Sequence, residues 1–348
     1  MNKIRNKQVI AEFIFAALFI IVVLLWGKEC SKGALKGIYF CAEVLVPSIF
    51  PFMVISVFIA ESGLSEKLGK ISGKLCAKIF GVSGNLAAVI IMSMIGGYPV
   101  GARGIAALAE NGTISREDAV KASYFAVGAG PGFLITFVGV NLLSNMELGL
   151  CLLASQIISV IIIGILNKNI IVKKHSYNSY KELSEPPLPF TSSLTKAVTS
   201  STYGIVEMCG MVVAFSAIIG IVEKLAGGAV VYLSIFLEVT AACNLLAENN
   251  SVILIAFAAG FGGLCVHFQI FAALKSIRIN KGLFFIYRII QGVLTALFTY
   301  LFIKIFNISL PVFSSVKAPL TLSLSSSAAG SALLIICAVS FIYSIKSS

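Results

Sequence analysis

The stretch GGYPVGARGIAAL, residues 96–108, places two glycines, a proline and an arginine inside an apolar run of membrane-spanning length. Glycine loosens a helix, proline removes a backbone donor, and a charge at bilayer depth costs about 3 kcal/mol or more. Backbone polar groups cannot be left open to lipid, so such a break is tolerated only where it faces protein or a water-filled cavity. The stretch is therefore predicted to line the interior of a membrane protein.

The composition of the whole chain indicates the same class. Of 348 residues, 58% are apolar and 12% are charged, and the mean hydropathy is +0.99. The formal net charge of +11 comes from lysines in short connectors that form no continuous basic face, which argues against nucleic acid as a partner. The eight cysteines have neither a C-x-x-C pair nor a regular spacing, so no disulfide framework and no metal site is predicted.

Apolar runs of spanning length recur along the chain and predict an all-α polytopic fold with about ten membrane segments. The runs cover residues 9–26, 35–62, 84–109, 118–143, 147–166, 197–222, 229–247, 251–274, 281–306 and 327–345. The first is interpreted as an uncleaved anchor helix, because no small-x-small cleavage site follows Trp26. The predicted divisions are an N-terminal anchor (1–34), a first repeat (35–166), a polar linker (167–195), and a second repeat with a C-terminal helix (196–348).

The two halves resemble each other in sequence. GGYPVGARGIAAL at 96–108 and GGLCVHFQIFAAL at 262–274 share six of thirteen residues. FPFMVISVFIAESGLSEKL from Phe50 and VVAFSAIIGIVEKL from Val212 match at a nearly equal offset. Related halves with interrupted helices are typical of transporters, in which the breaks line the substrate path. The distribution of basic connectors leaves open whether the halves are inverted and whether one segment is re-entrant.

Residues 65–80, SEKLGKISGKLCAKIF, carry two stripes at helical spacing. The apolar stripe is Leu68, Ile71, Leu75 and Ile79, and the basic stripe is Lys67, Lys70, Lys74 and Lys78. This pattern predicts an amphipathic helix on the cytoplasmic membrane surface, with anionic lipid as its partner. The alternative is a solvated connector with scattered lysines.

The first break suggests an anion site. A helix that restarts after Pro99 would point its N-terminal amides, which carry partial positive charge, into the interior. Arg103 follows one turn later and would add a full positive charge. The alternative is a glycine-mediated helix crossing in which Arg103 extends to the membrane interface.

The second break, at Gly262 and Gly263, leads into His267 and Gln269, and Gln269 takes the position equivalent to Arg103. A histidine in an apolar helix is either hydrogen-bonded packing or a group that contacts substrate or protons. Its position after a repeat-related break favours the second interpretation.

A third interruption, VGAGPGFLI at 127–135, contains Gly130 and Pro131, and its alternative is a simple proline kink. Glu238 and Asn244, on EVTAACN, are the best candidates for a polar lining in the second half. The complete predicted substrate-binding set is Gly96, Gly97, Tyr98, Pro99, Arg103, Gly130, Pro131, Glu238, Asn244, Gly262, Gly263, His267 and Gln269. Neither H-E-x-x-H nor G-x-S-x-G occurs, so no enzyme activity, catalytic residue or cofactor is predicted.

Four stretches in the same order carry a family resemblance: VPSIFPFMVIS, GGYPVGAR, AGPGFLI and GFGGLCVHFQI. Together they resemble the YlbJ-type sporulation integral membrane proteins of endospore-forming bacteria, within the wider group that carries the nucleoside-recognition or gate domain. The similarity runs from about Leu35 to Phe306. One departure is that Val127 and Gly128 precede the A-G-P stretch, where the family pattern often has a polar residue.

The resemblance implies two gate-like repeats in a multipass protein of the bacterial cell membrane or forespore membrane. Members are linked to moving dipicolinate, a small planar dianion, into the developing spore, so a permease for this small-molecule substrate is expected. The rival readings are a nucleoside permease and a sporulation scaffold that transports nothing. Helix faces rich in glycine could also pack against a second copy of the chain, so a homo-oligomer is a further alternative.

Overall fold

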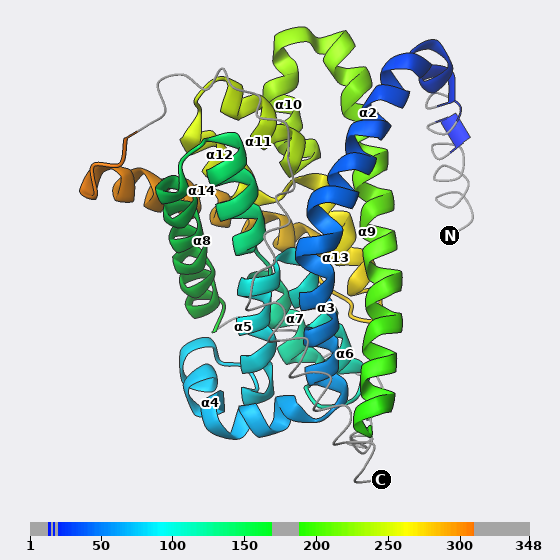
Figure 1. Cartoon of the computed structure of the whole chain (residues 1–348). Helices are drawn as coiled ribbons and strands as arrows, with labels where there is room; N and C mark the ends of the chain where they lie inside the picture. Colours follow the sequence, from blue (N-terminus) through cyan, green and yellow to red (C-terminus); the bar gives the residue numbers. More distant parts are fainter. Residues whose placement is uncertain (1–12, 15–16, 18–19, 169–187, 310–348) are drawn as a thin grey trace, which may run out of the picture.

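The computed structural model describes residues 13, 14, 17, 20–168 and 188–309, and all regular structure within these ranges is helical (Figure 1). The all-α prediction is thus confirmed for this part of the chain. The α-helices are α2 (Gly27–Phe40), α3 (Val46–Glu61), α4 (Leu64–Phe80), α5 (Ala87–Gly96), α6 (Tyr98–Glu110), α7 (Arg116–Phe125), α8 (Met146–Asn167), α9 (Phe190–Ala226), α10 (Val230–Leu237), α11 (Val239–Glu248), α12 (Val252–Phe261), α13 (Gly263–Ala273) and α14 (Lys281–Ile305). Two π-helical segments, η1 (Cys41–Leu45) and η3 (Gly132–Leu142), and two 3-10 turns, η2 (Gly84–Leu86) and η4 (Gly227–Ala229), connect them.

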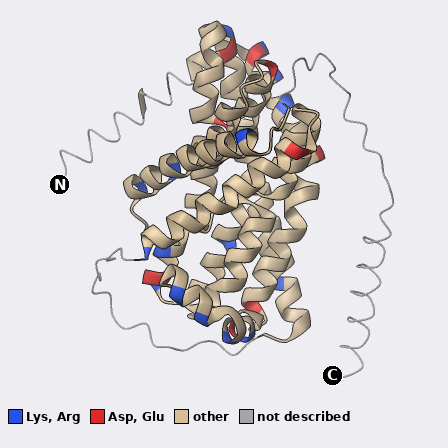
Figure 2. Cartoon of the chain, turned by 90° about the vertical axis from the view of Figure 1, so that its left-hand side faces the viewer, with Lys and Arg blue, Asp and Glu red and all other residues tan. Residues whose placement is uncertain are grey.

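Five helical stretches are long and apolar enough to cross a membrane. They are Gly27–Glu61, Met146–Asn167, Phe190–Leu237, Val252–Ala273 and Lys281–Ile305. A sixth results if α4 and the following Gly84–Gly96, which bend by 103° at their junction, form one span. Figure 2 shows charged residues gathered mainly at the two ends of the helical body, with a largely uncharged middle. The predicted count of ten is not confirmed, because several apolar runs form short broken helices, and the run at 327–345 lies outside the described residues.

Two predicted boundaries fall inside helices. The anchor was expected to end at residue 34, but α2 passes through this position and continues through η1 into α3. The helix before α2 ends at the turn at Trp26, and the residues of GKECSKG form the start of α2. The linker was expected to reach residue 195, whereas α9 begins at Phe190, directly after Pro189. The Leu188 amide donates to the Glu61 carbonyl (3.2 Å), which fixes this start against the end of α3.

The rod from α2 to α3 lies along α9 (Figure 1), and small residues allow the close approach of α2. Gly33 and Gly37 on α2 face Ser216 and Gly220 on α9, so each helix presents two small residues four positions apart. A Cβ on Gly220 would lie 2.5 Å from the Glu29 carbonyl oxygen, and a Cβ on Gly33 would collide with the Ser216 carbonyl. Helices in lipid associate through such close packing, since apolar burial gives little driving force there.

The predicted amphipathic helix is present as α4. Its apolar stripe and its lysines are both largely exposed, and a third face, made of small residues, packs on the protein. Its small residues, among them Gly73, pack on η2, where a Cβ on Gly73 would come within 2.9 Å of the Gly84 Cα. Of the predicted apolar stripe, Leu68, Ile71 and Leu75 point away from the protein, and Ile71 is 83% exposed. An apolar stripe turned outward is the arrangement expected of a helix that contacts lipid.

Four interruptions divide the remaining helices. Gly97 separates α5 from α6 and Gly262 separates α12 from α13, with φ values of 91° and 87° that favour glycine. The third lies between α7 and η3, around Gly130, as predicted. The fourth, between α10 and α11 at Glu238, was not predicted, because the apolar run 229–247 indicated one continuous span. The broken pairs α5–α6 and α12–α13 have the same helix–glycine–helix form, and the relation between the halves stays a prediction.

Replacing Gly33 by leucine is expected to destabilise the chain by about 1–3 kcal/mol, because the side chain would force α2 away from α9. The matched control is Gly27→Leu on the same helix, since a Cβ there meets nothing within 4 Å. Thermal unfolding of the full chain in detergent measures the difference. Equal melting temperatures for the two variants would contradict the packing argument.

Candidate functional site

Three of the four helix interruptions line a small, partly enclosed cavity of about 50 Å³, here called the break pocket. It lies between the start of α3, the break at Gly97, the region around Gly130, α9, the start of α11, and α13. Seven of the predicted residues line it: Gly96, Gly97, Tyr98, Pro99, Gly130, Glu238 and Gln269. Ligand pockets are several times larger, so a ring-sized molecule requires the surrounding helices to move apart.

Two of the interruptions touch through their backbones. A Cβ on Gly130 would lie 2.8 Å from the Ile95 carbonyl oxygen and 2.9 Å from the Gly97 amide nitrogen. The chain around Gly97 therefore packs directly against the chain around Gly130. The other two interruptions are paired in the same way, since a Cβ on Gly263 would lie 3.2 Å from the Glu238 amide nitrogen.

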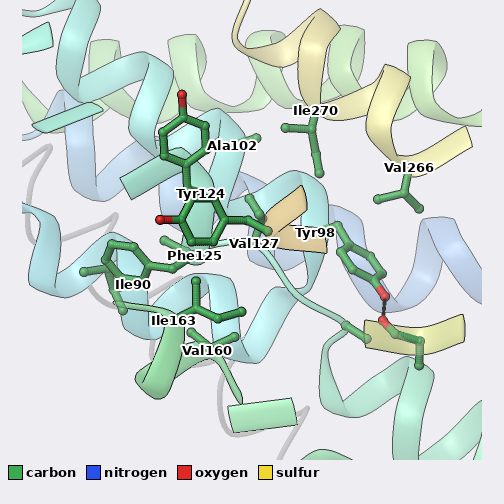
Figure 3. Close-up of a cluster of buried hydrophobic side chains, with 14 of the residues drawn as sticks. Ile90, Tyr98, Ala102, Tyr124, Phe125, Val127, Val160, Ile163, Val266 and Ile270 are labelled. Atoms are coloured by element: carbon green, nitrogen blue, oxygen red, sulfur yellow. Dashed lines mark hydrogen bonds between the residues drawn. The ribbon is translucent and has the colours of Figure 1, made fainter. Parts of the chain in front are cut away.

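Tyr98 connects the first broken helix to the second. Its hydroxyl donates to the carbonyl of Ala259 on α12, as Figure 3 shows. A Cβ on Gly262 would lie 3.5 Å from the Tyr98 ring, so the ring also lies beside the second break. Because the hydroxyl already has a partner, Tyr98 presents mainly its ring to the break pocket.

Glu238 brings a carboxylate to the pocket and places it at a helix start. The buried side chain caps α11 by accepting from the amides of Thr240 (2.9 Å) and Ala241 (2.8 Å). This is an N-cap arrangement, in which the negatively charged carboxylate lies at the positive end of the helix dipole. In contrast, α6 and α13 start at Gly97 and Gly262 without a side-chain cap. At the start of α6, Pro99 has no N–H and the Val100 amide donates to the Gly97 carbonyl (3.2 Å), so the Tyr98 amide is the donor left there for a ligand.

Arg103 lies away from the break pocket, so the predicted single locus of Arg103 and the amides after Pro99 is not present. The guanidinium pairs with Glu207 on α9 (2.7 Å), next to Gly204, where a Cβ would lie only 2.8 Å from Arg103 Nε. The reason is helical geometry: Arg103 projects from the face of α6 that α9 covers. The pair is partly exposed, with 19% of the arginine and 44% of the glutamate side chain accessible.

Arg103 lines a second, wider hollow of about 880 Å³, here called the outer cleft. Its walls carry Glu61, Glu110, Lys196 and Lys275, together with a row of hydroxyl side chains at the start of α9. Lys196 pairs with Glu61 (2.8 Å), and Ser276 donates to Glu110 (2.9 Å). The outer cleft therefore has mixed charge and many hydroxyl groups.

Five further predicted residues are not among those that line the break pocket: Pro131, Asn244, Gly262, Gly263 and His267. His267 is buried, with Nε2 2.9 Å from the Phe261 carbonyl oxygen and its ring edge-on to Phe261, Phe284 and Phe285. This geometry is the hydrogen-bonded packing that was the alternative to a substrate contact. Asn244 donates to the Thr240 carbonyl (3.0 Å), and Pro131 precedes η3.

Sequence reasoning missed the most deeply buried charge. Arg288 on α14 is fully buried, and it donates to the carbonyls of Val127 (2.6 Å) and Tyr124 (2.8 Å). Its guanidinium also lies 5.3 Å from the centre of the Phe284 ring. The available signal was an arginine three positions before Gln291 in the middle of an apolar helix.

The described residues contain no cluster of three or more His, Cys, Asp or Glu side chains that could hold a metal ion. The seven cysteines within them are free, and five are buried.

Comparison with known proteins finds a relative of this chain. The chain is 25% identical, over an alignment of 346 positions, to the sporulation integral membrane protein YlbJ of Bacillus subtilis (strain 168). The alignment covers 87% of this chain and 84% of YlbJ. The resemblance to YlbJ-type proteins is confirmed. Together with the apolar helices, the similarity to YlbJ identifies the chain as a multipass integral membrane protein. No family model and no solved structure matches the chain, so the gate-domain relation remains a prediction.

The pair of Arg103 and Glu207 is expected to stabilise the fold through a direct interaction. Arg103→Gln and Glu207→Gln should each lower the melting temperature, and the double variant should lose less than the sum of the two. The coupling expected for a partly exposed pair is roughly 0.5–1 kcal/mol. Thermal unfolding of the four proteins in detergent gives this energy, and strictly additive losses would show that the two side chains do not interact.

Proposed function

We propose that the chain is a sporulation permease, not an enzyme, that passes a small anion, dipicolinate, across a forespore membrane. The observation that carries the proposal is the meeting of helix interruptions around the break pocket, at Gly97, Gly130 and Glu238. Interrupted helices around a buried cavity are how many transporters build a substrate site. The association with sporulation comes from YlbJ, whose name places that relative in spore formation.

The proposed path runs from the outer cleft to the break pocket along α6 and α9. Tyr203 lines the outer cleft and Met208 lines the break pocket, so the two hollows are less than two turns of α9 apart. The pair of Arg103 and Glu207 lies between them. Arg103 is thus assigned to the access route, where exchange of Glu207 for a passing carboxylate would draw an anion inward.

Within the break pocket, the proposal assigns carboxylate binding to the uncapped start of α6. Helix starts bind anions through free amides and the helix dipole. Gln269 on α13 lines the same cavity, where its amide would orient the ring. The two related halves would supply the two broken helices, α5–α6 and α12–α13, and the glycine breaks would allow the cavity to widen.

One observation favours a nucleoside permease as the second candidate. The polar groups that line the break pocket, Glu238 and Gln269, are suited to hydroxyl and base edges, whereas Arg103 lies outside it. The predicted gate-domain relation points to the same substrate class. A scaffold without transport is the third candidate, and in it the interruptions would serve packing alone.

The test is release of dipicolinate from vesicles that contain the purified full chain, followed by terbium luminescence outside. The wild type should release dipicolinate, and Gly130→Ala should slow release about tenfold or more, which corresponds to ~1.4 kcal/mol. The added methyl would collide with the chain at Ile95 and Gly97. Gly210→Ala on α9 is the matched control, because a Cβ there meets nothing within 4 Å.

Vesicles loaded with uridine separate the candidates. Release of uridine but not of dipicolinate would establish the nucleoside reading, and release of neither would favour the scaffold. Equal rates of dipicolinate release for Gly130→Ala and Gly210→Ala would show that the break pocket is not on the transport path.

We further propose that α4 binds anionic lipid, since its exposed apolar stripe lies beside four exposed lysines, Lys67, Lys70, Lys74 and Lys78. Each lysine near an anionic surface contributes about 1 kcal/mol. Adding phosphatidylglycerol should raise the melting temperature of the wild type in neutral detergent, and replacing the four lysines by glutamine should abolish most of this rise. Lys28→Gln with Lys32→Gln on α2 is the control, and an unchanged response of the fourfold variant would contradict the proposal.

A further inference from the structure

Three buried N–H groups near the α7–η3 interruption have no hydrogen-bond partner among the described residues. They are Nε of Arg288, Nε2 of Gln291 and Nε2 of Gln156. All three side chains are at least 98% buried. A buried donor without an acceptor costs about 1–3 kcal/mol, so three of them at one place call for an explanation.

The three donors are gathered around Val127 and Gly128. A Cβ on Gly128 would lie 2.6 Å from Gln156 Nε2 and 3.4 Å from Gln291 Nε2, so the two amide groups flank this glycine. Arg288 reaches the adjacent residue, because its Nη1 donates to the Val127 carbonyl. Arg288 and Gln291 are three residues apart on α14 and therefore share one face of that helix.

The Gln156 oxygen lies 3.1 Å from the Thr295 hydroxyl, which also lies 3.2 Å from the Ser159 hydroxyl, and the Gln156 amide nitrogen is directed toward Gly128. A hollow of about 10 Å³ lies beside Gly128 and Gln156, and its lining does not include Arg288 or Gln291. It has room for one water-sized group.

The charge at this place is positive and has no ion-pair partner among the described residues. The Arg288 guanidinium contacts two carbonyls and a phenyl ring, and no carboxylate of the described residues lies within ion-pair distance of it. Buried charges in proteins are ordinarily paired, because desolvation of an isolated charge is costly. A set of N–H donors beside an unpaired cation is the chemistry that recognises an anion.

We propose that Arg288, Gln291 and Gln156 form a binding site for one small monovalent anion, either a halide or a single carboxylate group. The anion would accept from the three free N–H groups and neutralise the guanidinium. Because Arg288 also holds the carbonyls of Tyr124 and Val127, occupation would stabilise the interrupted segment after α7. None of these three side chains lines the break pocket, so the anion site does not depend on the proposed transport.

The test is the melting temperature of the full chain in detergent as sodium chloride replaces sodium methanesulfonate, which is neither a halide nor a carboxylate, at constant ionic strength. A hundredfold excess over the dissociation constant should raise it by about 2–4 °C for a chain of this size. The rise should saturate and should be the same in Gly210→Ala. Gln291→Met and Gln156→Met, which keep the side-chain volume, should weaken chloride binding about tenfold or more, since each removes one N–H donor to an anion.

Both methionine variants should fold, because Gln291→Met removes two unpartnered polar atoms and Gln156→Met removes one. No saturable rise in the wild type would overturn the site, and so would an unchanged chloride response in both variants. Acetate and dipicolinate in place of chloride separate the two sources of the anion: a response to acetate identifies a carboxylate site. If the chloride response is present while vesicle release of dipicolinate is not, the site stands and the proposed function fails.

Discussion

In a lipid bilayer an interrupted helix persists only where its freed backbone groups meet other protein or enclosed water. This constraint explains why the interruptions of this chain meet one another. The chain at Gly97 packs on the chain at Gly130, and Gly263 packs on the backbone at Glu238. Any side chain at Gly130 would separate the first pair, so these positions determine whether the cavity between the broken helices can form. The long helix α9 runs along one side of this arrangement (Figure 1).

The charged groups within the membrane region are compensated in three different ways. Arg103 has a carboxylate partner, Glu238 has two amides at a helix start, and Arg288 has two carbonyls. Only in the first case does the compensation come from a second full charge. An ion pair can exchange partners with a charged ligand, whereas a cap is part of the backbone structure and its loss disrupts a helix. The three charges therefore differ in how readily they can take part in binding.

The sequence predicted the features that conflict with an ordinary membrane helix. Glycine and proline in GGYPVGAR and in VGAGPGFLI conflict with their surroundings, and so the breaks at Gly97 and Gly130 were predicted. The break at Glu238 was missed because EVTAACN contains neither glycine nor proline, and a glutamate cap is a weak signal. Contacts between residues far apart in the sequence could not be predicted. Glu207 lies 104 residues from Arg103, and no local pattern indicates that Gly204 makes room for that arginine. Arg288 was overlooked because the long apolar helix around it masked a single polar position.

Arg288 also relates the fold to the order in which the chain is made. The carbonyls that it holds belong to Tyr124 and Val127, which are synthesised 164 and 161 residues earlier. Until α14 enters the membrane, the segment after α7 lacks the side chain that satisfies these two groups. Ribosomal synthesis adds about 5–20 residues per second, so this interval lasts for many seconds. The N-terminal half therefore cannot reach its final structure by itself, and the last described helix completes an element laid down in the first half.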